Sequence, residues 1–520
     1  MHPLAALDQR YVWHPFTQMR DWLKGDPVII MEGQGALLRD VHGREYLDAN
    51  SSIWTNLHGH NHPRINAAIR RQLAKIAHSS ALGLANGPAS LLAAKLVEVA
   101  SPACVRQALS MPAEGAPSQP PQRTWPLSKS ADRQPSLQKV FFSDDGSTAM
   151  EVALKLAYEF ARRTGRNRKP RFLTLAGAYH GDTVGAVALG HIDLFHRAYA
   201  GLLFKTDQVM APYCYRCPFN RAKPERADAR DYRKCNWECV GKLEQKFAAQ
   251  RKRGNSYAAF VFEPLMQGAA GMIPQPPGWL SRAAETARAY GALLIADEVM
   301  TGFGRTGVRA REGERPREPK PPRKPELART PAPPLFACHQ ENVQPDFMAL
   351  AKGLTGGYLP MAATLTTQAV FDAFLGEYDE FKTFFHGHSF TGNQLGSAAA
   401  LSSLALLQSR TSIRARRRLE AALRHELPAL WRHPAVGDIR QVGLIAGIEL
   451  VRDWRTRESF DLRERAGIRV CEAMARRGVL TRPIGNVVLL MPPYCTTASQ
   501  VGQMVGVLGE AIRETSRVKE

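Results

Sequence analysis

Short runs of apolar residues alternate, along the middle of the chain, with segments whose apolar positions recur at helical spacing. Runs of this kind are typical of strands that are buried on both faces of a sheet. Their alternation with helical patterns predicts an α/β fold, in which a mostly parallel sheet carries helices on both faces. The five clearest runs cover residues 140–142, 171–175, 258–262, 293–296 and 347–351.

The pattern changes toward both ends of the chain, so we expect three segments. Residues 1–85 contain scattered aromatic side chains and no long periodic stretch before 65–76. Residues 86–400 carry the alternation of strands and helices. Residues 401–520 change to amphipathic helices and short strands, such as 443–450. We expect this last segment to form a C-terminal domain that closes over a site in the large domain.

Two stretches interrupt the large segment. Residues 104–136 are rich in Pro, Ser and Gln, and residues 309–334 are rich in Pro and Arg, which is typical of disordered surface insertions. The second stretch, with 162–171 and 414–418, holds much of the excess behind the formal net charge of +21. A basic loop could bind polyanions nonspecifically. Because much of the excess charge lies in a predicted disordered insertion, we expect no biological nucleic-acid role. A non-catalytic nucleic-acid-binding protein stays a distant alternative.

Membrane, export and metal signals are weak. The sequence has no run of about 18 apolar residues, so we expect no transmembrane helix. The N-terminus lacks the pattern of a secretory signal, so we expect a cytoplasmic protein. Four of the eight cysteines form a CxxC followed by a CxxxC, a spacing that could hold zinc. Neither half is packaged like a zinc ribbon, so we favour reduced thiols without a metal at Cys214, Cys217, Cys235 and Cys239.

Charged residues follow the ends of three predicted strands. Lys352 comes directly after the run 347–351, and burial there would lower its pKa and make the amine a nucleophile, as in a Schiff base with a carbonyl compound or with pyridoxal phosphate. Asp297 follows the run 293–296, and Glu263 ends the strand before it. Both carboxylates would face the crevice beyond the strand ends. Asp297 could there hold a pyridine nitrogen in its protonated form.

A candidate anion site precedes these residues in the chain. Gly146 allows a tight turn after the first predicted strand, and Ser147 and Thr148 can cap the helix predicted by the periodic apolar positions of 149–160. A strand, a glycine–serine turn and a helix N-terminus together favour anion binding. Tyr179 adds an aromatic ring that could stack on a cofactor.

The motifs around these residues resemble a known family. SDDGSTAMEVALK, YHGDTVGA, EPLMQGAAGM, LLIADEVMTGFGRTG and LAKGLTGGYLP are similar to the class III, fold-type I aminotransferases that depend on pyridoxal phosphate. The flanking motifs WHPFTQM, SSIWTNLHGHNHP, FFHGHSFTGNQLG and TRPIGNVVLLMPPY resemble the 8-amino-7-oxononanoate aminotransferases of biotin synthesis. The resemblance implies a fold-type I architecture. Its large domain would bind pyridoxal phosphate, and its smaller α+β domain would be formed by the N- and C-terminal segments.

The resemblance also implies a role for each candidate residue. Lys352 would form the Schiff base with the cofactor and, as a free amine, would move a proton between substrate and cofactor. Asp297 would bond the pyridine nitrogen. Tyr179 would stack near the cofactor and the substrate. Gly146 and Ser147 would bind the phosphate.

A further set of residues matches a part of the family site that is shared between subunits. His388 and Ser389 match a second phosphate clamp, which the family usually offers from the neighbouring subunit, and Gly387 would line the substrate site. The family more often has Pro-Thr at the clamp, and serine keeps the hydroxyl. A shared clamp implies a homodimer with twofold symmetry.

The remaining residues concern the substrates. By resemblance, Arg482 would grip the carboxylate of 8-amino-7-oxononanoate, with Phe16, Ile53 and Trp54 as an apolar wall. S-adenosylmethionine is the expected amino donor. However, relatives that use it typically show tryptophan at Ile53 and tyrosine at Phe16 and Leu489, and these substitutions resemble a branch that uses lysine. L-Lysine therefore stays an alternative donor, and another class III aminotransferase of ω-amino acids or polyamines stays an alternative function.

Overall fold

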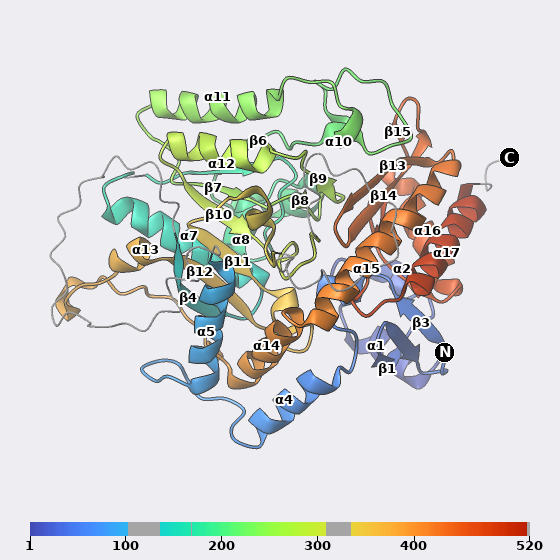
Figure 1. Cartoon of the computed structure of the whole chain (residues 1–520), viewed down its shortest axis with the longest axis horizontal. Helices are drawn as coiled ribbons and strands as arrows, with labels where there is room; N and C mark the ends of the chain where they lie inside the picture. The colour runs from blue at the N-terminus through green and yellow to red at the C-terminus, as the bar shows by residue number, and fades with distance from the viewer. Residues whose placement is uncertain (102–135, 168, 308–333, 517–520) are drawn as a thin grey trace, which may run out of the picture.

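The computed structural model describes residues 1–101, 136–167, 169–307 and 334–516 (Figure 1). The two stretches predicted as insertions, 104–136 and 309–334, lie almost entirely outside the described residues. A seven-stranded sheet forms the centre, in the order β4-β12-β11-β10-β7-β5-β6. Its strands are β4 (Leu137–Ser143), β5 (Phe172–Leu175), β6 (Asp207–Val209), β7 (Ala259–Phe262), β10 (Leu293–Asp297), β11 (Phe347–Leu350) and β12 (Ala362–Thr367).

The predicted α/β fold with a mostly parallel sheet is confirmed. β10 runs parallel to β7 and β11, and β5 runs parallel to β6 and β7. β12 is antiparallel to both of its neighbours, β11 and β4. The five predicted apolar runs correspond to β4, β5, β7, β10 and β11, whereas β6 and β12 were not predicted. β6 has only three residues, and β12 reads AATLTT, so neither shows a long apolar run.

Side chains of the central strands pack alternately on the two faces of the sheet. Leu293 and Ile295 of β10 join a cluster with the apolar face of α7 (Gly146–Arg163). Leu294 and Ala296 point the other way, into a cluster with α11 (Glu238–Lys252) and α12 (Trp279–Ala289), which Figure 1 shows stacked together beside the sheet. Because both faces are covered, every residue of β10 is buried.

The two ends of the chain meet in smaller sheets. β16 pairs in parallel with β3, which joins the C-terminal part to the N-terminal sheet β1-β2-β3. A second sheet has the order β13-β14-β18-β17, with β15 on the edge of β14, and β8 pairs with β9. The remaining strands are β1 (Ile30–Gln34), β2 (Leu37–Asp40), β3 (Glu45–Asp48), β8 (Met266–Gln267), β9 (Ile273–Pro274), β13 (Val436–Val442), β14 (Ile445–Asp453), β15 (Glu458–Ser459), β16 (Val479–Leu480), β17 (Pro483–Ile484) and β18 (Val487–Leu490).

The remaining elements are helices, and one of them spans a predicted segment boundary. The boundary predicted between 400 and 401 falls inside α14, and the division into three segments stays a prediction. The other described helices are α1 (Pro3–Tyr11), α2 (Met19–Trp22), α3 (Ser51–Trp54), α4 (Pro63–Leu73), α5 (Gly87–Ala100), α8 (Val184–Leu189), α9 (Asp193–His196), α10 (Ala229–Tyr232), α13 (Gln368–Asp372), α14 (Gln394–Leu407), α15 (Arg410–Glu426), α16 (Ala466–Arg476) and α17 (Ala498–Ser516).

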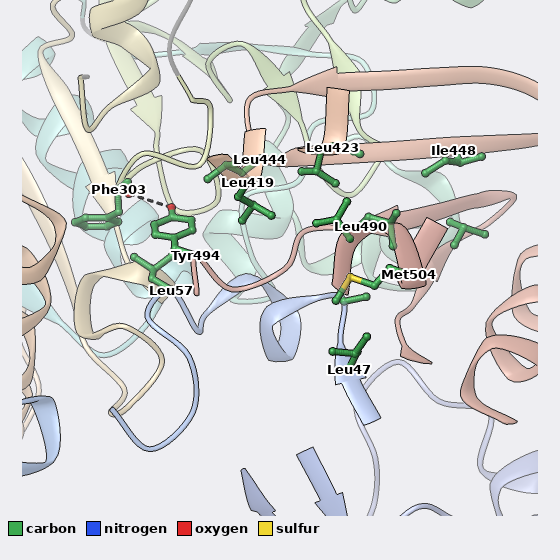
Figure 2. Packing of buried hydrophobic residues seen from close by; sticks show 14 of the residues in the cluster. Leu47, Leu57, Phe303, Leu419, Leu423, Leu444, Ile448, Leu490, Tyr494 and Met504 are labelled. Carbon is green, nitrogen blue, oxygen red and sulfur yellow. Dashed lines mark hydrogen bonds between the residues drawn. The ribbon is translucent and has the colours of Figure 1, made fainter. Parts of the chain in front are cut away.

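One apolar cluster fastens the terminal parts to the large sheet. Figure 2 shows two residues of the N-terminal part on the side of residues of the C-terminal part: Leu57 lies beside Tyr494, and Leu47 lies on the side of Met504. Tyr494 follows β18, and its hydroxyl donates to the backbone oxygen of Phe303 at 3.0 Å (Figure 2). The N-terminal part, the C-terminal part and strands of the central sheet therefore share one continuous apolar core.

Membrane-spanning helices and metal-binding cysteines can be checked in the described part of the chain. No helix there is long and apolar enough to cross a membrane. Cys214, Cys217, Cys235 and Cys239 are described with free thiols. Among the described residues, no group of three or more His, Cys, Asp or Glu side chains is arranged to hold a metal ion. Reduced, metal-free cysteines therefore stay a prediction.

Candidate active site

Lys352 lies at the carboxyl edge of the central sheet. It follows β11 and begins the short 3-10 helix η5 (Lys352–Thr355), with a φ of +45°. The residue is partly exposed, but its amine lies in the interior, and this burial lowers the pKa of the amine to about 8. The Nζ atom stands 4.4 Å from the centre of the Trp54 ring. A partly neutral amine is what a nucleophilic lysine requires, and a backbone in a sparsely populated conformation is common at functional sites.

Asp297 ends β10, on the neighbouring strand, opposite Ala349 of β11. One carboxylate oxygen lies 2.8 Å from Nδ1 of His180, and the other accepts the backbone N–H of Val299 at 3.0 Å. Both oxygens are therefore fixed, and the carboxylate cannot rotate freely. His180 is buried, and among the described residues its Nε2 atom has no hydrogen-bond partner. Sequence reasoning missed this histidine, although it follows Tyr179 directly.

A second buried carboxylate, Glu263, follows β7 on the same edge. Its oxygens accept the backbone N–H groups of Gly268 at 2.7 Å and of Tyr179 at 3.3 Å. Burial raises the pKa of Glu263 to about 7. The negative charges of Asp297 and Glu263 raise the pKa of Lys352 and so partly offset the effect of burial, because both favour the protonated amine. Two carboxylates and one amine thus meet at the ends of three adjacent strands, as the sequence predicted.

The candidate anion site is the N-terminus of α7. Asp145, and not Ser147 or Thr148 as predicted, is the N-cap residue. Its side chain accepts the N–H of Thr148, and the Thr148 hydroxyl accepts the N–H of Asp145 in return. Gly146 is the first helical residue and makes no left-handed turn. Glycine is needed there because a Cβ would stand 2.8 Å from Cγ1 of Val299.

Ser147 lies one residue further, within the first turn of this helix. Its hydroxyl accepts the backbone N–H of Asp182 at 3.1 Å. Gly181, at a φ of +125°, is so close that a Cβ there would stand 2.2 Å from the Ser147 hydroxyl oxygen. The first N–H groups of a helix have no partner inside it, so this turn offers donors to an anion.

Tyr179 begins a row of aromatic contacts that ends at Arg482. Its hydroxyl donates to Asp182 at 2.6 Å, and burial together with this bond raises its pKa. Phe195 contacts the Tyr179 ring edge-on at 6.3 Å and the Phe16 ring at 5.3 Å. Arg482 donates from Nη2 to the backbone oxygen of Phe16 at 3.4 Å. Phe16 and Arg482 are therefore brought together, and Phe195 is the wall residue that sequence reasoning missed.

Ile53 and Trp54 lie on α3, close to the lysine. Ile53 is 44% exposed, whereas Trp54 is partly buried against an apolar cluster that includes Leu489. The indole N–H of Trp54 is buried, and in the described part of the chain it finds no acceptor. Of the predicted wall residues, Trp54 therefore lies against the Lys352 amine, and Ile53 precedes it on the same helix.

The predicted second clamp lies on a separate loop. His388 contacts Asp144 at 3.2 Å through Nδ1, and the backbone oxygen of Ser389 lies 2.8 Å from Nε2 of His78. Gly387 is exposed, with no atom within 4 Å of where its Cβ would be. Within the described residues of one chain, no recorded contact joins this loop to Lys352.

The residues fit pyridoxal phosphate. A buried amine of lowered pKa, a carboxylate with both oxygens fixed, and a helix N-terminus with unused donors lie around the carboxyl edge of one sheet. The unpartnered His180 Nε2 and the close packing of Gly146 on Val299 and of Gly181 on Ser147 belong to the same region. The amine would meet the carbonyl group of the cofactor, the carboxylate its pyridine nitrogen, and the helix N-terminus its phosphate.

The chain belongs to the class III aminotransferases. The family model "Aminotransferase class-III" matches residues 22–312 and 328–512. The protein is accordingly an aminotransferase that depends on pyridoxal phosphate.

Named relatives match over almost the whole chain. The adenosylmethionine-8-amino-7-oxononanoate aminotransferase of Geobacter sulfurreducens is 43% identical over 509 residues, which cover 98% of this chain and 97% of the relative. The crystal structure of the enzyme of that name from Methanocaldococcus jannaschii matches with a TM-score of 0.80 and 35% identity, over 98% of each chain. The omega transaminase of Pseudomonas jessenii in complex with PMP matches with a TM-score of 0.80, 26% identity and 99% coverage of each chain.

Proposed function

We propose that the protein transfers an amino group from S-adenosylmethionine to 8-amino-7-oxononanoate, forming 7,8-diaminononanoate for biotin synthesis. The observation that carries this proposal is the wall that runs from Tyr179 through Phe195 and Phe16 to Arg482. A long apolar keto acid with a distal carboxylate suits such a wall with an arginine at its end. The names of the relatives support the same substrate pair.

Lys352 is the residue to which we assign proton movement. Pyridoxal phosphate, when bound, supplies a carbonyl for the lysine amine and a pyridine ring that accepts electrons from the substrate carbon. Because the pKa of Lys352 is lowered to about 8, a useful fraction of the amine is neutral near neutral pH. The neutral amine can take the proton from the substrate carbon and, once protonated, would deliver it to the cofactor carbon.

Asp297, Gly146 and Ser147 would hold the cofactor. Asp297, oriented by His180 and the Val299 N–H, would keep the pyridine nitrogen protonated. Backbone donors at Gly146 and Ser147 would bind the phosphate. Tyr179 would lie along the ring, at the start of the substrate wall.

Arg482 would bind the substrate carboxylate. Its guanidinium is exposed to solvent on the side of Phe16, so it is open to a ligand. A hydrogen bond to a charged partner contributes about 1.5–3 kcal/mol, enough to set the orientation of a long substrate. Ile53 and Trp54 would confine the apolar chain near the lysine.

L-Lysine is the second candidate donor. The aliphatic side chain of Ile53 is 44% exposed beside Trp54, where a second ring would favour a sulfonium and an adenine. Leu489 is buried beneath the same cluster and offers no polar group. This observation favours a donor without an aromatic base.

We further propose a homodimer with twofold symmetry. Large apolar side chains are exposed on two segments that touch each other through His78 and Ser389. A second copy would cover this surface and bring Gly387, His388 and Ser389 to the neighbouring site. The exposed apolar residues are Ile76, Leu82, Leu84, Leu91, Tyr378, Phe381, Phe385 and Phe390.

A mixing experiment tests the shared clamp. Lys352→Ala and Ser389→Asp should each be inactive, because the first removes the amine and the second places a negative charge at the phosphate. The two variants are then mixed in equal amounts, unfolded and refolded together. If Ser389 acts across the interface, each heterodimer has one intact site, so about one quarter of all sites should be active. Recovery of no activity, with dimers present by sedimentation, would exclude a clamp supplied by the partner.

The substrate proposal is tested by product formation. Purified holoenzyme is incubated with 8-amino-7-oxononanoate and either donor, and 7,8-diaminononanoate is measured by mass spectrometry, with Lys352→Ala as the control. Product with S-adenosylmethionine is expected. Product with neither donor would contradict the proposal, and activity on simple ω-amino acids would point to another class III aminotransferase. We also propose that the protein is cytoplasmic, and fractionation of cells would test this location.

A further inference from the structure

The segment that carries Ile53 and Trp54 has an unusual backbone. Four consecutive residues of α3 have positive φ angles, namely 48° at Ser51, 48° at Ser52, 62° at Ile53 and 69° at Trp54. Side chains other than glycine disfavour this left-handed region, and β-branched isoleucine especially so. Strain of this kind persists only where the surroundings hold it, and it gathers at functional sites.

Asp48 holds the beginning of this left-handed turn. The residue is 3% exposed. Its Oδ1 accepts the backbone N–H groups of Asn50 at 3.2 Å and Ser52 at 3.1 Å. Its Oδ2 accepts the Ser52 hydroxyl at 3.0 Å and lies 2.9 Å from Nε2 of His60. The four contacts of this carboxylate lie on Asn50 just before the turn, on Ser52 within it, and on His60.

His60 is itself fixed by a second residue. Its Nδ1 lies 2.9 Å from the side-chain nitrogen of Asn56, and the Asn56 side-chain oxygen accepts the N–H of Gly59 at 2.9 Å. The Asn56 amide nitrogen can only donate, so Nδ1 of His60 accepts and Nε2 carries the proton toward Asp48. Although burial opposes it, the bonds from His60 and Ser52 keep the pKa of Asp48 below its ordinary value.

The other side of the turn is tied to the large domain and to the C-terminal part. The Ser51 hydroxyl donates to the backbone oxygen of Met491 at 2.6 Å. Arg305 is 1% exposed and donates from Nη2 to the backbone oxygens of Trp54 at 3.4 Å and Asn56 at 3.2 Å. The turn is therefore bonded at both ends, and the Trp54 ring stands 4.4 Å from the lysine amine as a result.

We propose that Asp48 and His60 are positioning residues, which hold the left-handed turn 51–54 so that Trp54 lies against Lys352 and Ile53 faces the substrate. The inference rests on the proposed function only in that Lys352 is the reactive amine. Asp48 touches no reacting atom. Its removal would allow the turn to relax into a right-handed conformation, which would carry Trp54 away from the amine.

The test separates the position of Trp54 from general damage. Asp48→Asn and His60→Phe are compared with Asp40→Asn, a matched control that removes another buried carboxylate. Asp40 accepts bonds from His42, Arg44 and Tyr46 in the same N-terminal sheet and does not contact the turn. Each protein is made with and without Trp54→Phe, and the near-ultraviolet circular dichroism of each pair is subtracted to give the signal of Trp54 alone.

The Trp54 signal should fall by about half or more in Asp48→Asn and His60→Phe and should stay unchanged in Asp40→Asn. On the holoenzyme, Asp48→Asn should lower kcat/KM about tenfold, and Trp54→Phe should then add less than about twofold, because both changes act through one side chain. An undiminished Trp54 signal in a folded Asp48→Asn protein would overturn the inference. If that variant fails to fold, Ser52→Ala takes its place. It removes only the hydrogen bond from the Ser52 hydroxyl to Asp48, and an undiminished Trp54 signal in it would likewise overturn the inference.

These measurements also keep the two proposals apart. The dichroism uses no substrate, so it judges the turn even if the enzyme fails to act on 8-amino-7-oxononanoate. Additive effects of Asp48→Asn and Trp54→Phe on kcat/KM would likewise contradict positioning through Trp54.

Discussion

Replacing Gly181 by alanine should disrupt the phosphate cradle without touching Lys352. The backbone of Gly181 has a φ of +125°, and an added Cβ would stand 2.2 Å from Oγ, 2.5 Å from Cβ and 2.6 Å from Cα of Ser147. Ser147 lies in the first turn of α7, which the Asp145–Thr148 capping box fixes. Because the clash includes a backbone atom, rotation of the serine side chain cannot relieve it, and the first turn itself must move.

The size of the effect follows from these contacts. A strained backbone costs about 1–3 kcal/mol, and an overpacked contact adds about 1–3 kcal/mol. If the first turn moves aside instead, the phosphate loses a hydrogen bond to a charged group, which is worth about 1.5–3 kcal/mol. That loss corresponds to a dissociation constant for pyridoxal phosphate that is about 10- to 150-fold higher.

Gly165→Ala is the matched control. Gly165 also has a positive φ, of +68°, but no atom lies within 4 Å of its added Cβ. Both variants therefore carry a strained backbone, and only one carries the clash. The assays are the free energy of unfolding of the cofactor-free proteins in denaturant, at one fixed protein concentration, and titration with pyridoxal phosphate followed by absorbance.

We expect Gly165→Ala to bind the cofactor as the wild type does and Gly181→Ala to bind it at least about tenfold more weakly. Equal cofactor affinity in the two variants would refute the assignment of the phosphate to the N-terminus of α7. Equal unfolding free energies would refute the steric argument as well.

Three other predictions concern single groups. Asp297→Asn should lower kcat by about 100-fold or more while cofactor still binds, because a neutral amide cannot hold a protonated pyridine nitrogen; near-normal kcat would contradict this. Arg482→Ala should raise the KM for the keto acid about 10- to 100-fold, with kcat less affected and Arg482→Lys in between; an unchanged KM would remove the carboxylate clamp. Burial raises the pKa of Glu298 from 4.5 to about 7. The folded protein thus holds an extra proton between these values, and its free energy of unfolding should fall as the pH rises from 5 to 8. In Glu298→Gln that fall should be smaller by about 3 kcal/mol in denaturant titrations, and an equal fall would contradict the burial argument.

The positions of Lys352 and Asp297 were predictable because they depend on strand order alone. Buried parallel strands are visible as apolar runs, and their carboxyl ends meet at one edge of the sheet. Residues that follow two neighbouring runs are therefore brought together, as the pairing of β10 with β11 confirms.

Other features depend on contacts between distant segments, and no local pattern contains them. The bond from His180 to Asp297 joins residues 117 positions apart. The contact of Phe195 with Phe16 depends on how α9 meets the N-terminal loop. The need for glycine at 146 comes from Val299, and not from a turn. The N-cap was misplaced by two or three residues because Asp145, Ser147 and Thr148 are all suited to that role, and only the observed capping box decides between them.

The most direct test of the account is a single-turnover experiment on the purified holoenzyme. S-adenosylmethionine and L-lysine are added separately, and the visible absorption band of the lysine-bound cofactor is followed. We expect S-adenosylmethionine alone to remove the band and 8-amino-7-oxononanoate to restore it. Removal by L-lysine alone would keep the reaction and change the donor. Removal by neither donor, or no restoration by 8-amino-7-oxononanoate, would contradict the proposed function.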